Sequence, residues 1–443
     1  MESSLVDLAR FSLTLAGLVV GGRLGRCLDA PLVGEIVAGL LLGPDGVGLV
    51  PEPSAWVLVG NLGLVLLVME GALHIDVTSL RRVGPVAVVI AVVGTVLPIA
   101  LGTGYMVAAG YDPETGVAAG TSLSSTSIGM ATAMMSRVGE LNTPLGSLIC
   151  VAAMVDDILS LVILAVVATL GTGADSGAAS AVAARVARPV LVSLAVVLLG
   201  RLAFAVVPTV VDAAKRRTEP EHHRELTLVA MLVLTLGLTL ASGAAGSTFL
   251  LGAFAGGFAF ARDESARDAW RSLEDPVAWL HSVFFLAVGT QIPLKHVFSA
   301  RGFGLGVGYA VPAVAGKIVT GCFLAPDWIR ARIVGWAMVG RGELGFVMAR
   351  QAKVSGLMGD VPYVACVWAL LVATLASPVF MRRALERLRR DEHVAAAAEV
   401  RVDGDAMQPG PRGWRLRGAG TTRPGRAGAE TGRAEDAVAS AKR

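Results

Sequence analysis

Long apolar segments recur along almost the whole chain, and this feature constrains the fold more than any other. A helix needs about 20 consecutive apolar residues to cross the hydrocarbon core of a bilayer. We therefore expect an all-α polytopic membrane protein with about 13 transmembrane helices. The expected spans cover residues 4–22, 31–49, 55–73, 84–109, 115–136, 143–170, 181–209, 225–242, 244–261, 275–292, 299–325, 329–352 and 359–381.

The distribution of positive charge between the loops predicts an orientation. Basic residues gather in every second loop, such as Arg81 and Arg82 or residues 215–217, whereas YDPET and ASGAAGS have none. Lys295 and Lys353 lie in the two loops that break this alternation. Because basic loops stay in the cytoplasm, we expect the N-terminus outside and the C-terminus in the cytoplasm.

Charge is scarce except at one end of the chain. Only 16% of the residues are charged, whereas soluble domains average about 25%. The net charge of +3 comes from residues 389–443, which hold 11 basic and 8 acidic groups, while residues 1–388 hold 27 of each. These values exclude a soluble enzyme, a nucleic-acid-binding protein and a secreted disulfide-rich protein.

The same numbers predict two parts: a transmembrane body of residues 1–388 and a charged, disordered cytoplasmic tail of residues 389–443. The tail lacks the GxGxxG fingerprint of a nucleotide-binding domain. The four cysteines lie far apart, without a Cys/His cluster, so neither a zinc site nor a disulfide framework is expected. We expect no bound cofactor.

Two adjacent acids, Asp156 and Asp157, lie in the middle of the apolar run ICVAAMVDDILSLVILAVV. Ionisable groups inside a membrane are costly and usually mark a functional site. Neighbouring residues on a helix point about 100° apart, so one carboxyl can face a water-filled cavity while the other faces a partner helix. The pair predicts a site that binds protons or cations.

Lys317 lies inside the apolar run YAVPAVAGKIVTGCFL. A lysine at that depth needs a counter-ion, and Asp156 or Asp157 is the obvious candidate. The alternative is that its amino group extends to the membrane interface.

A dense cluster of hydroxyl residues, TSLSSTSIGMATAM, interrupts the 115–136 span. Ser and Thr side chains compete with the helix for backbone hydrogen bonds. A locally unwound helix would offer carbonyl and hydroxyl oxygens as ligands for a hard cation. The alternative is that these small residues only pack helices together.

Two further groups of charges lie in or near predicted spans. Arg341 and Glu343 in VGRGELGFVMAR are expected to pair with each other or with the Asp/Lys group, in either a structural or a transport role. Glu70 lies near a helix end and fits an interfacial carboxylate better than a site residue. His74 has no metal-binding partner at helical spacing.

Several stretches together resemble the cation:proton antiporter family, in the branch of bacterial NapA-type sodium/proton antiporters and Kef-type potassium efflux systems. The resemblance covers residues 5–385, and its most specific element is the Asp-Asp pair followed by an intramembrane lysine. The stretches are PLVGEIVAGLLLGP, SLSSTSIGMA, the Asp-Asp helix, FFLAVGTQI and GRGELGFVMA.

The resemblance implies the sodium/proton antiporter fold: two inverted repeats, a core domain that moves against a dimerisation domain, and two broken helices that cross near the bilayer midplane. It implies a first break at Ser125, Thr126 and Ser127, whose oxygens would be unwound-helix ligands. It implies a second break in the 299–325 helix.

By position, Asp157 matches the family's cation- and proton-binding carboxylate, and Asp156 matches the acid that pairs with the helix lysine, here Lys317. Kef-type proteins usually carry Gln-Asp at this pair and a C-terminal nucleotide-binding domain, and the chain lacks both. VMEGALHID replaces the family's Phe-x-x-Gly-Leu-Glu stretch, which leaves the role of Glu70 open.

We therefore expect electrogenic exchange of a monovalent cation, Na⁺, for protons by alternating access, in a homodimer that contacts lipid and no nucleic acid. Asp157 and Asp156 would bind either the transported Na⁺ or protons, and Lys317 would neutralise Asp156 in the proton-loaded state. The alternative within transport is K⁺/proton exchange or regulated K⁺ efflux.

Two other classes fit less well. An intramembrane aspartic protease needs its two acids on facing helices, whereas Asp156 and Asp157 are adjacent. A structural membrane protein would not need buried Asp and Lys side chains. No enzymatic activity is expected.

Overall fold

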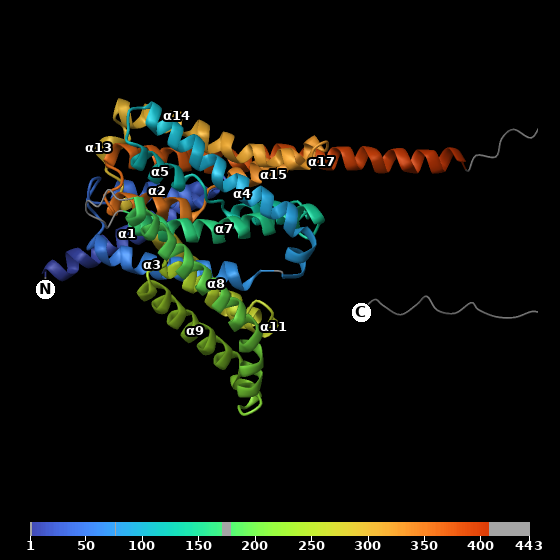
Figure 1. Ribbon diagram of the computed structural model, residues 1–443, viewed down its shortest axis with the longest axis horizontal. Coiled ribbons are helices and arrows are strands. Elements are labelled where there is room, and N and C mark those ends of the chain that lie inside the picture. The colour runs from blue at the N-terminus through green and yellow to red at the C-terminus, as the bar shows by residue number, and fades with distance from the viewer. Residues whose placement is uncertain (1, 76, 171–178, 407–443) are drawn as a thin grey trace, which may run out of the picture. The chain divides into compact units, whose positions relative to one another are not determined.

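The computed structural model describes residues 2–75, 77–170 and 179–406, and these residues form helices joined by loops and turns (Figure 1). The first eight helices are α1 (Glu2–Arg26), α2 (Pro31–Leu42), α3 (Pro53–Leu73), α4 (Val77–Ala108), α5 (Pro113–Ser122), α6 (Ile128–Arg137), α7 (Pro144–Leu170) and α8 (Ala179–Lys215).

The later described residues continue in the same way, with three short 3-10 helices among the α-helices. These elements are η1 (Pro220–His222), α9 (His223–Ala245), α10 (Phe249–Ala259), α11 (Glu264–Trp270), η2 (Arg271–Leu273), α12 (Glu274–Thr290), α13 (Leu294–Val297), α14 (Ala300–Ile318), η3 (Val319–Leu324), α15 (Trp328–Val339), α16 (Glu343–Val354) and α17 (Asp360–Ala406).

The predicted all-helical membrane fold is confirmed. Eight helices of the described chain are long and apolar enough to cross a membrane: α1, α3, α4, α7, α8, α9, α14 and α17. The apolar helices α2 and α10 are shorter. Two predicted spans, 115–136 and 329–352, are each divided into a pair of short helices, α5 with α6 and α15 with α16.

The helices pack in two groups. In the first group α12 packs against α2 and α3, and α10 packs against α3, α8 and α9. In the second group α4 packs against α5, α7 and α14, and α16 packs against α5 and α7. Figure 1 shows α4, α5 and α14 on one side of the packed helices and α8, α9 and α11 on the other side. The groups meet where α7 contacts α8 and α10 and where α16 contacts α12.

One order of elements occurs twice in the second group. A long helix, a broken helix and another long helix follow one another as α4, α5–α6 and α7, and again as α14, α15–α16 and α17. This repetition agrees with the predicted pair of repeats, each contributing one broken helix.

The expected position of the second break is wrong. The 299–325 segment is continuous as α14 and then tightens into η3, whereas the break falls at residues 340–342. The physical reason is the pair of glycines on either side of Arg341. A Cβ added to Gly342 would lie 3.1 Å from the Cα of Ser127, so glycine allows the two broken helices to touch.

The described part of the predicted tail, residues 389–406, is helical, and the disorder of the tail stays a prediction. Helix α17 continues through Ala406, because the segment beyond Arg389 is rich in Ala, Arg and Glu, which favour helix. Residues 407–443 of the predicted tail lie outside the described residues. Residues 1–391 form one compact unit.

Candidate functional site

The two helix breaks touch each other directly. The backbone N–H of Ser127, between α5 and α6, donates a hydrogen bond of 2.9 Å to the carbonyl of Gly340, between α15 and α16. The hydroxyl of Thr126 donates to the carbonyl of Met338 over 3.2 Å. Two helix N-termini and two helix C-termini therefore meet in one buried region, each with unpaired backbone groups to satisfy.

Hydroxyl side chains explain the first break, which lies where the Ser/Thr cluster predicted it. The hydroxyls of Thr121, Ser122 and Ser124 each donate to a carbonyl three residues earlier, over 2.6–2.8 Å. Ser127 then caps α6 by accepting a hydrogen bond from the N–H of Met130. These local bonds replace the helical pattern.

Asp156 and Lys317 form an ion pair with no exposed side-chain surface. The Lys317 Nζ lies 2.9 Å from Oδ1 of Asp156 and also donates to the hydroxyl of Thr126 over 2.8 Å. Thr95 on α4 donates to the same Oδ1 over 2.8 Å. The pair thus joins α4, α7 and α14 to the first break.

Asp157 lies in a different environment from its neighbour. It lines a cavity of about 570 Å³, together with Ser127 and Thr132 of the α6 end and Glu343 of the α16 end. Its Oδ1 is buried without a hydrogen-bond partner. No ion pair joins Asp157 to any side chain that the structure describes. The carboxylate is therefore free to bind a proton or a cation that enters the cavity.

The cavity has walls from both helix groups. Glu70 on α3, His74 directly after α3 and Phe254 on α10 line it from the first group. Cys150 on α7 and Asn142 just before α7 line it from the second group. Glu70, expected to be an interfacial carboxylate, is therefore placed at the cavity.

The expected ion pair between Arg341 and Glu343 is absent among the described side chains. Arg341 is fully buried, and its guanidinium instead donates to the carbonyls of Leu123, Ser125 and Ala313. The physical reason is that Arg341 lies in the break, where the end of α5 presents unpaired carbonyls. Glu343 starts α16 and lines the cavity.

The three predicted ligands of the first break have different neighbours. The carbonyl of Ser125 accepts from Arg341, and its own hydroxyl is buried without a partner. Thr126 bonds to Lys317. Ser127 is the one of the three that lines the cavity with Asp157.

Sequence reasoning missed Thr95, which binds Asp156 directly. The only available signal was one hydroxyl in the apolar stretch AVVGTVLPIA. Such a residue is common in helix packing, so it could not be distinguished without knowing that α4 lies beside α7.

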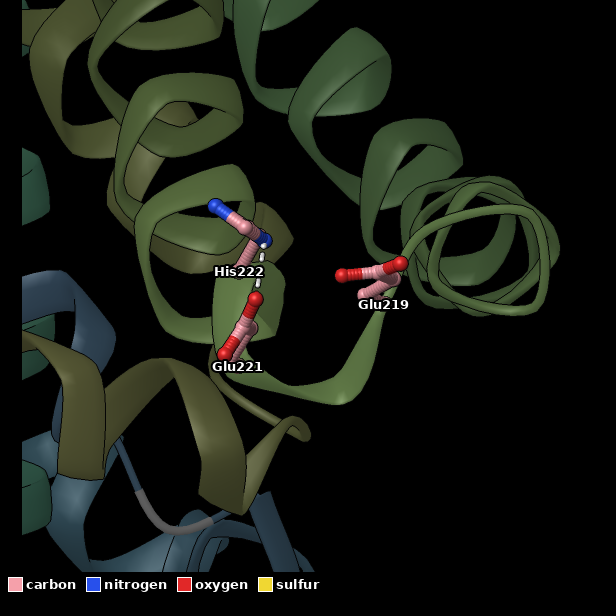
Figure 2. Close-up of side chains that lie close together, drawn as sticks. All are labelled: Glu219, Glu221 and His222. Carbon is pink, nitrogen blue, oxygen red and sulfur yellow. Dashed lines mark ion pairs between the residues drawn. The ribbon is translucent and has the colours of Figure 1, made fainter.

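One group of three side chains in the described chain converges closely enough to hold a metal ion. Glu219, Glu221 and His222 are all exposed and lie at the turn between α8 and α9 (Figure 2). Nδ1 of His222 lies 3.8 Å from Oε1 of Glu221. None of the three lines the Asp157 cavity, and exposed groups of this kind are common without a bound ion.

Comparison with protein families gives one match over nearly the whole membrane body. The matching family is that of the transmembrane sodium/hydrogen exchangers, and the match covers residues 11–386 of the chain.

Two curated proteins are similar to the chain over most of their length. The high-affinity Na⁺/H⁺ antiporter NhaS3 of Synechocystis is 27% identical over 432 residues, which cover 87% of this chain and 92% of that protein. The Na⁺/H⁺-K⁺ antiporter GerN of Bacillus cereus is 24% identical, over 84% of this chain and 95% of that protein.

Among solved structures, the sodium proton antiporter MjNhaP1 of Methanocaldococcus jannaschii has a similar fold. The TM-score is 0.63 at 15% sequence identity, and the match covers 85% of this chain and 96% of that structure.

Proposed function

The chain belongs to the family of transmembrane sodium/hydrogen exchangers, and from that premise we propose that it exchanges Na⁺ for protons at Asp157. The observation that carries the proposal is the contrast between two adjacent acids. Asp156 is held by Lys317 and Thr95, whereas Asp157 lines the cavity without a partner for its buried oxygen.

Competition for one carboxylate couples the two fluxes. Asp157 holds either a proton or Na⁺, never both, so each ion leaves as the other arrives. A ligand can shift a conformational equilibrium only by its differential affinity for the two states. Either ion satisfies this condition by neutralising a carboxylate that is otherwise left charged inside the protein.

The Asp156–Lys317 pair supplies the second proton that is exchanged. In the proton-loaded state the ammonium neutralises Asp156. When Na⁺ approaches Asp156 as well as Asp157, the ammonium loses its partner and releases a proton. Two protons then exchange for one Na⁺, which makes transport electrogenic. Oδ2 of Asp156 is buried without a hydrogen-bond partner, which supports this contact.

Alternating access requires the two helix groups to move against each other. The location of the cavity supports such a movement, because its walls come from α3 and α10 of one group and from α6, α7 and α16 of the other. Sliding of the second group would carry Asp157 away from Glu70 and toward the opposite side of the membrane.

The proposed orientation places this cavity on the cytoplasmic side. It is lined by the C-terminal end of α3 and by Leu141 and Asn142 before α7, in the loop that follows the basic residue Arg137 at the end of α6. The described conformation then corresponds to access from the cytoplasm. We further propose a homodimer, since α8 and α9 carry exposed apolar side chains such as Leu198 and Leu236 that a second copy can cover in the bilayer.

Exchange of K⁺ for protons is the second candidate. It is supported by the similarity to GerN, whose name includes K⁺ and which matches over 95% of its own length.

Exchange in proteoliposomes tests the proposal. Vesicles with an imposed pH gradient and an internal pH dye receive Na⁺, K⁺ or Li⁺, with the wild type beside Asp157→Asn and a control, Glu221→Gln, at an exposed site. We expect Na⁺ to collapse the gradient with the wild type and the control but not with Asp157→Asn. Full exchange by Asp157→Asn would overturn the assignment, and exchange with K⁺ alone would favour the second candidate.

A further inference from the structure

A second acid without an ion-pair partner among the described side chains lines the Asp157 cavity. Glu343 is the first residue of α16 and is half-buried. It forms no ion pair with Arg341 or with any other side chain that the structure describes. It comes from the second broken helix, whereas Asp157 comes from α7, so two different elements bring a carboxylate to one cavity of about 570 Å³.

The buried charges around the two breaks leave these acids in excess. Asp156 is paired with Lys317. The guanidinium of Arg341 donates hydrogen bonds to carbonyls just after α5 and on α14, and not to a carboxylate. Asp157 and Glu343 have no fixed counter-ion, and two negative charges in one partly enclosed cavity repel each other. A cation between them would relieve the repulsion.

Two hydroxyl side chains that line the same cavity also suit a hard cation. The cavity is lined by Ser127 and Thr132, whose hydroxyl oxygens are ligands of the type that hard cations prefer. The carboxylates of Asp157 and Glu343 would supply the charge, and the hydroxyls would complete the oxygen shell.

We infer that Glu343 is a further carboxylate of the cation site, in addition to Asp157 and Asp156, and shares the transported cation with Asp157. This inference rests on the proposed function and deepens it. Glu343 then sets how tightly the cation binds, while Asp157 remains the group at which the cation and the proton compete.

A purely structural role predicts a different behaviour. An acid at the start of a helix is stabilising because it interacts with the positive end of the helix dipole. Glu264 has that same position at the start of α11 but is exposed and does not line the cavity. It provides a matched control, since the substitution Glu264→Gln removes the same charge from the same helical position.

The test compares wild type, Glu343→Gln, Glu343→Asp and Glu264→Gln in proteoliposomes. The apparent KM and maximal rate are measured for Na⁺ at one alkaline pH, and the melting temperature is measured in detergent. We expect Glu343→Gln to raise the KM for Na⁺ about tenfold or more, equivalent to about 1.4 kcal/mol of lost binding. Glu343→Asp keeps the charge, so its KM should lie between those of the wild type and Glu343→Gln. Glu264→Gln should keep the wild-type KM.

A KM for Glu343→Gln within twofold of the wild type would overturn the inference, as would an equal rise in Glu264→Gln. If Glu343→Gln fails to fold, Glu343→Asp decides: a KM unchanged from the wild type, despite the shorter side chain, would count against a direct ligand. Failure of the proposed function is distinguishable, because it would appear as no Na⁺-dependent exchange by the wild type or as full exchange by Asp157→Asn.

Discussion

At the scale of single residues, the site depends on the difference between two neighbours on one helix. Asp156 accepts hydrogen bonds from Lys317 and Thr95, whereas Asp157 lines a cavity. The rotation of about 100° between successive helical residues produces that difference. It was predictable from the sequence that the two acids have separate roles, but which acid meets which partner depends on how α4 and α14 pack.

The Asp156–Lys317 pair should show strong coupling in stability. Removing one partner of a buried ion pair costs about 3–5 kcal/mol, because the other charge stays buried and uncompensated. We expect Lys317→Met to lower the thermal stability in detergent markedly, and Asp156→Asn combined with Lys317→Met to recover part of the loss. A double variant as unstable as the sum of both single variants would show that the two groups do not interact.

The hydroxyl of Thr95 should contribute through its bond to Asp156. A hydrogen bond to a charged group contributes about 1.5–3 kcal/mol, and Thr95→Val removes it with little change in volume. The matched control is Thr239→Val on α9, because the hydroxyl of Thr239 is buried without a partner. Unfolding measurements should show a loss for Thr95→Val and little or none for Thr239→Val; equal effects would contradict the assigned bond.

Sequence reasoning failed at Arg341 for an identifiable reason. Spacing in the chain indicated an ion pair with Glu343. Arg341, however, lies in the break before α16, whereas Glu343 is the first residue of that helix. Arg341 satisfies the carbonyls of Leu123 and Ser125 instead. A guanidinium that bonds to backbone carbonyls has no acidic partner in the sequence, so only the fold reveals its role.

At the scale of helices, close backbone contact depends on small residues. Helices in lipid associate largely through packing, and glycine allows the closest approach. Gly257 on α10 is an example, since a Cβ there would lie 2.0 Å from the carbonyl oxygen of Met69 on α3. The cavity wall formed by α3 and α10 depends on this contact.

Adding one methyl group at this contact should separate the two helices. We expect Gly257→Ala to lower the melting temperature in detergent, by an amount equivalent to about 1–3 kcal/mol for overpacking. Gly237→Ala on α9, where a Cβ would meet nothing within 4 Å, should leave stability unchanged or slightly higher. A neutral Gly257→Ala would show that α3 and α10 are not packed as described.

The elements were predictable to different degrees. Apolar length alone indicated nearly every helix, and the Ser/Thr cluster indicated the first break. The resemblance placed the second break in the 299–325 helix, whereas it lies at residues 340–342. Glycines such as those beside Arg341 are frequent in membrane helices, so they did not mark a break. Helix α17 extends through residues 389–406, where a run of alanines favours helix.

At the scale of the whole membrane unit, two ion pairs and a hydrogen bond connect the two helix groups. Asp29, in the loop between α1 and α2, lies 2.6 Å from Arg137 at the end of α6 and also pairs with Arg382 on α17. On α16, Arg350 donates to Asn61 of α3 over 3.3 Å. If the groups move against each other during transport, these contacts must break in each cycle.

The Asp29 contacts should therefore affect the rate of transport more than ion binding. We expect Asp29→Asn to raise the maximal exchange rate at least twofold with an unchanged KM for Na⁺. Asp268→Asn removes an exposed ion pair with Arg271 that spans only three residues and should change neither value. An altered KM, or an unchanged rate in Asp29→Asn, would contradict movement between the groups at this contact.

The central claim is that Na⁺ and protons compete for the carboxylate of Asp157. Proton release from the purified protein in detergent, measured with a pH dye in weak buffer when Na⁺ is added, tests it most directly. The wild type should release protons with a saturable dependence on Na⁺, and Asp157→Asn should release none at the same concentrations. Equal proton release from both proteins would contradict the claim.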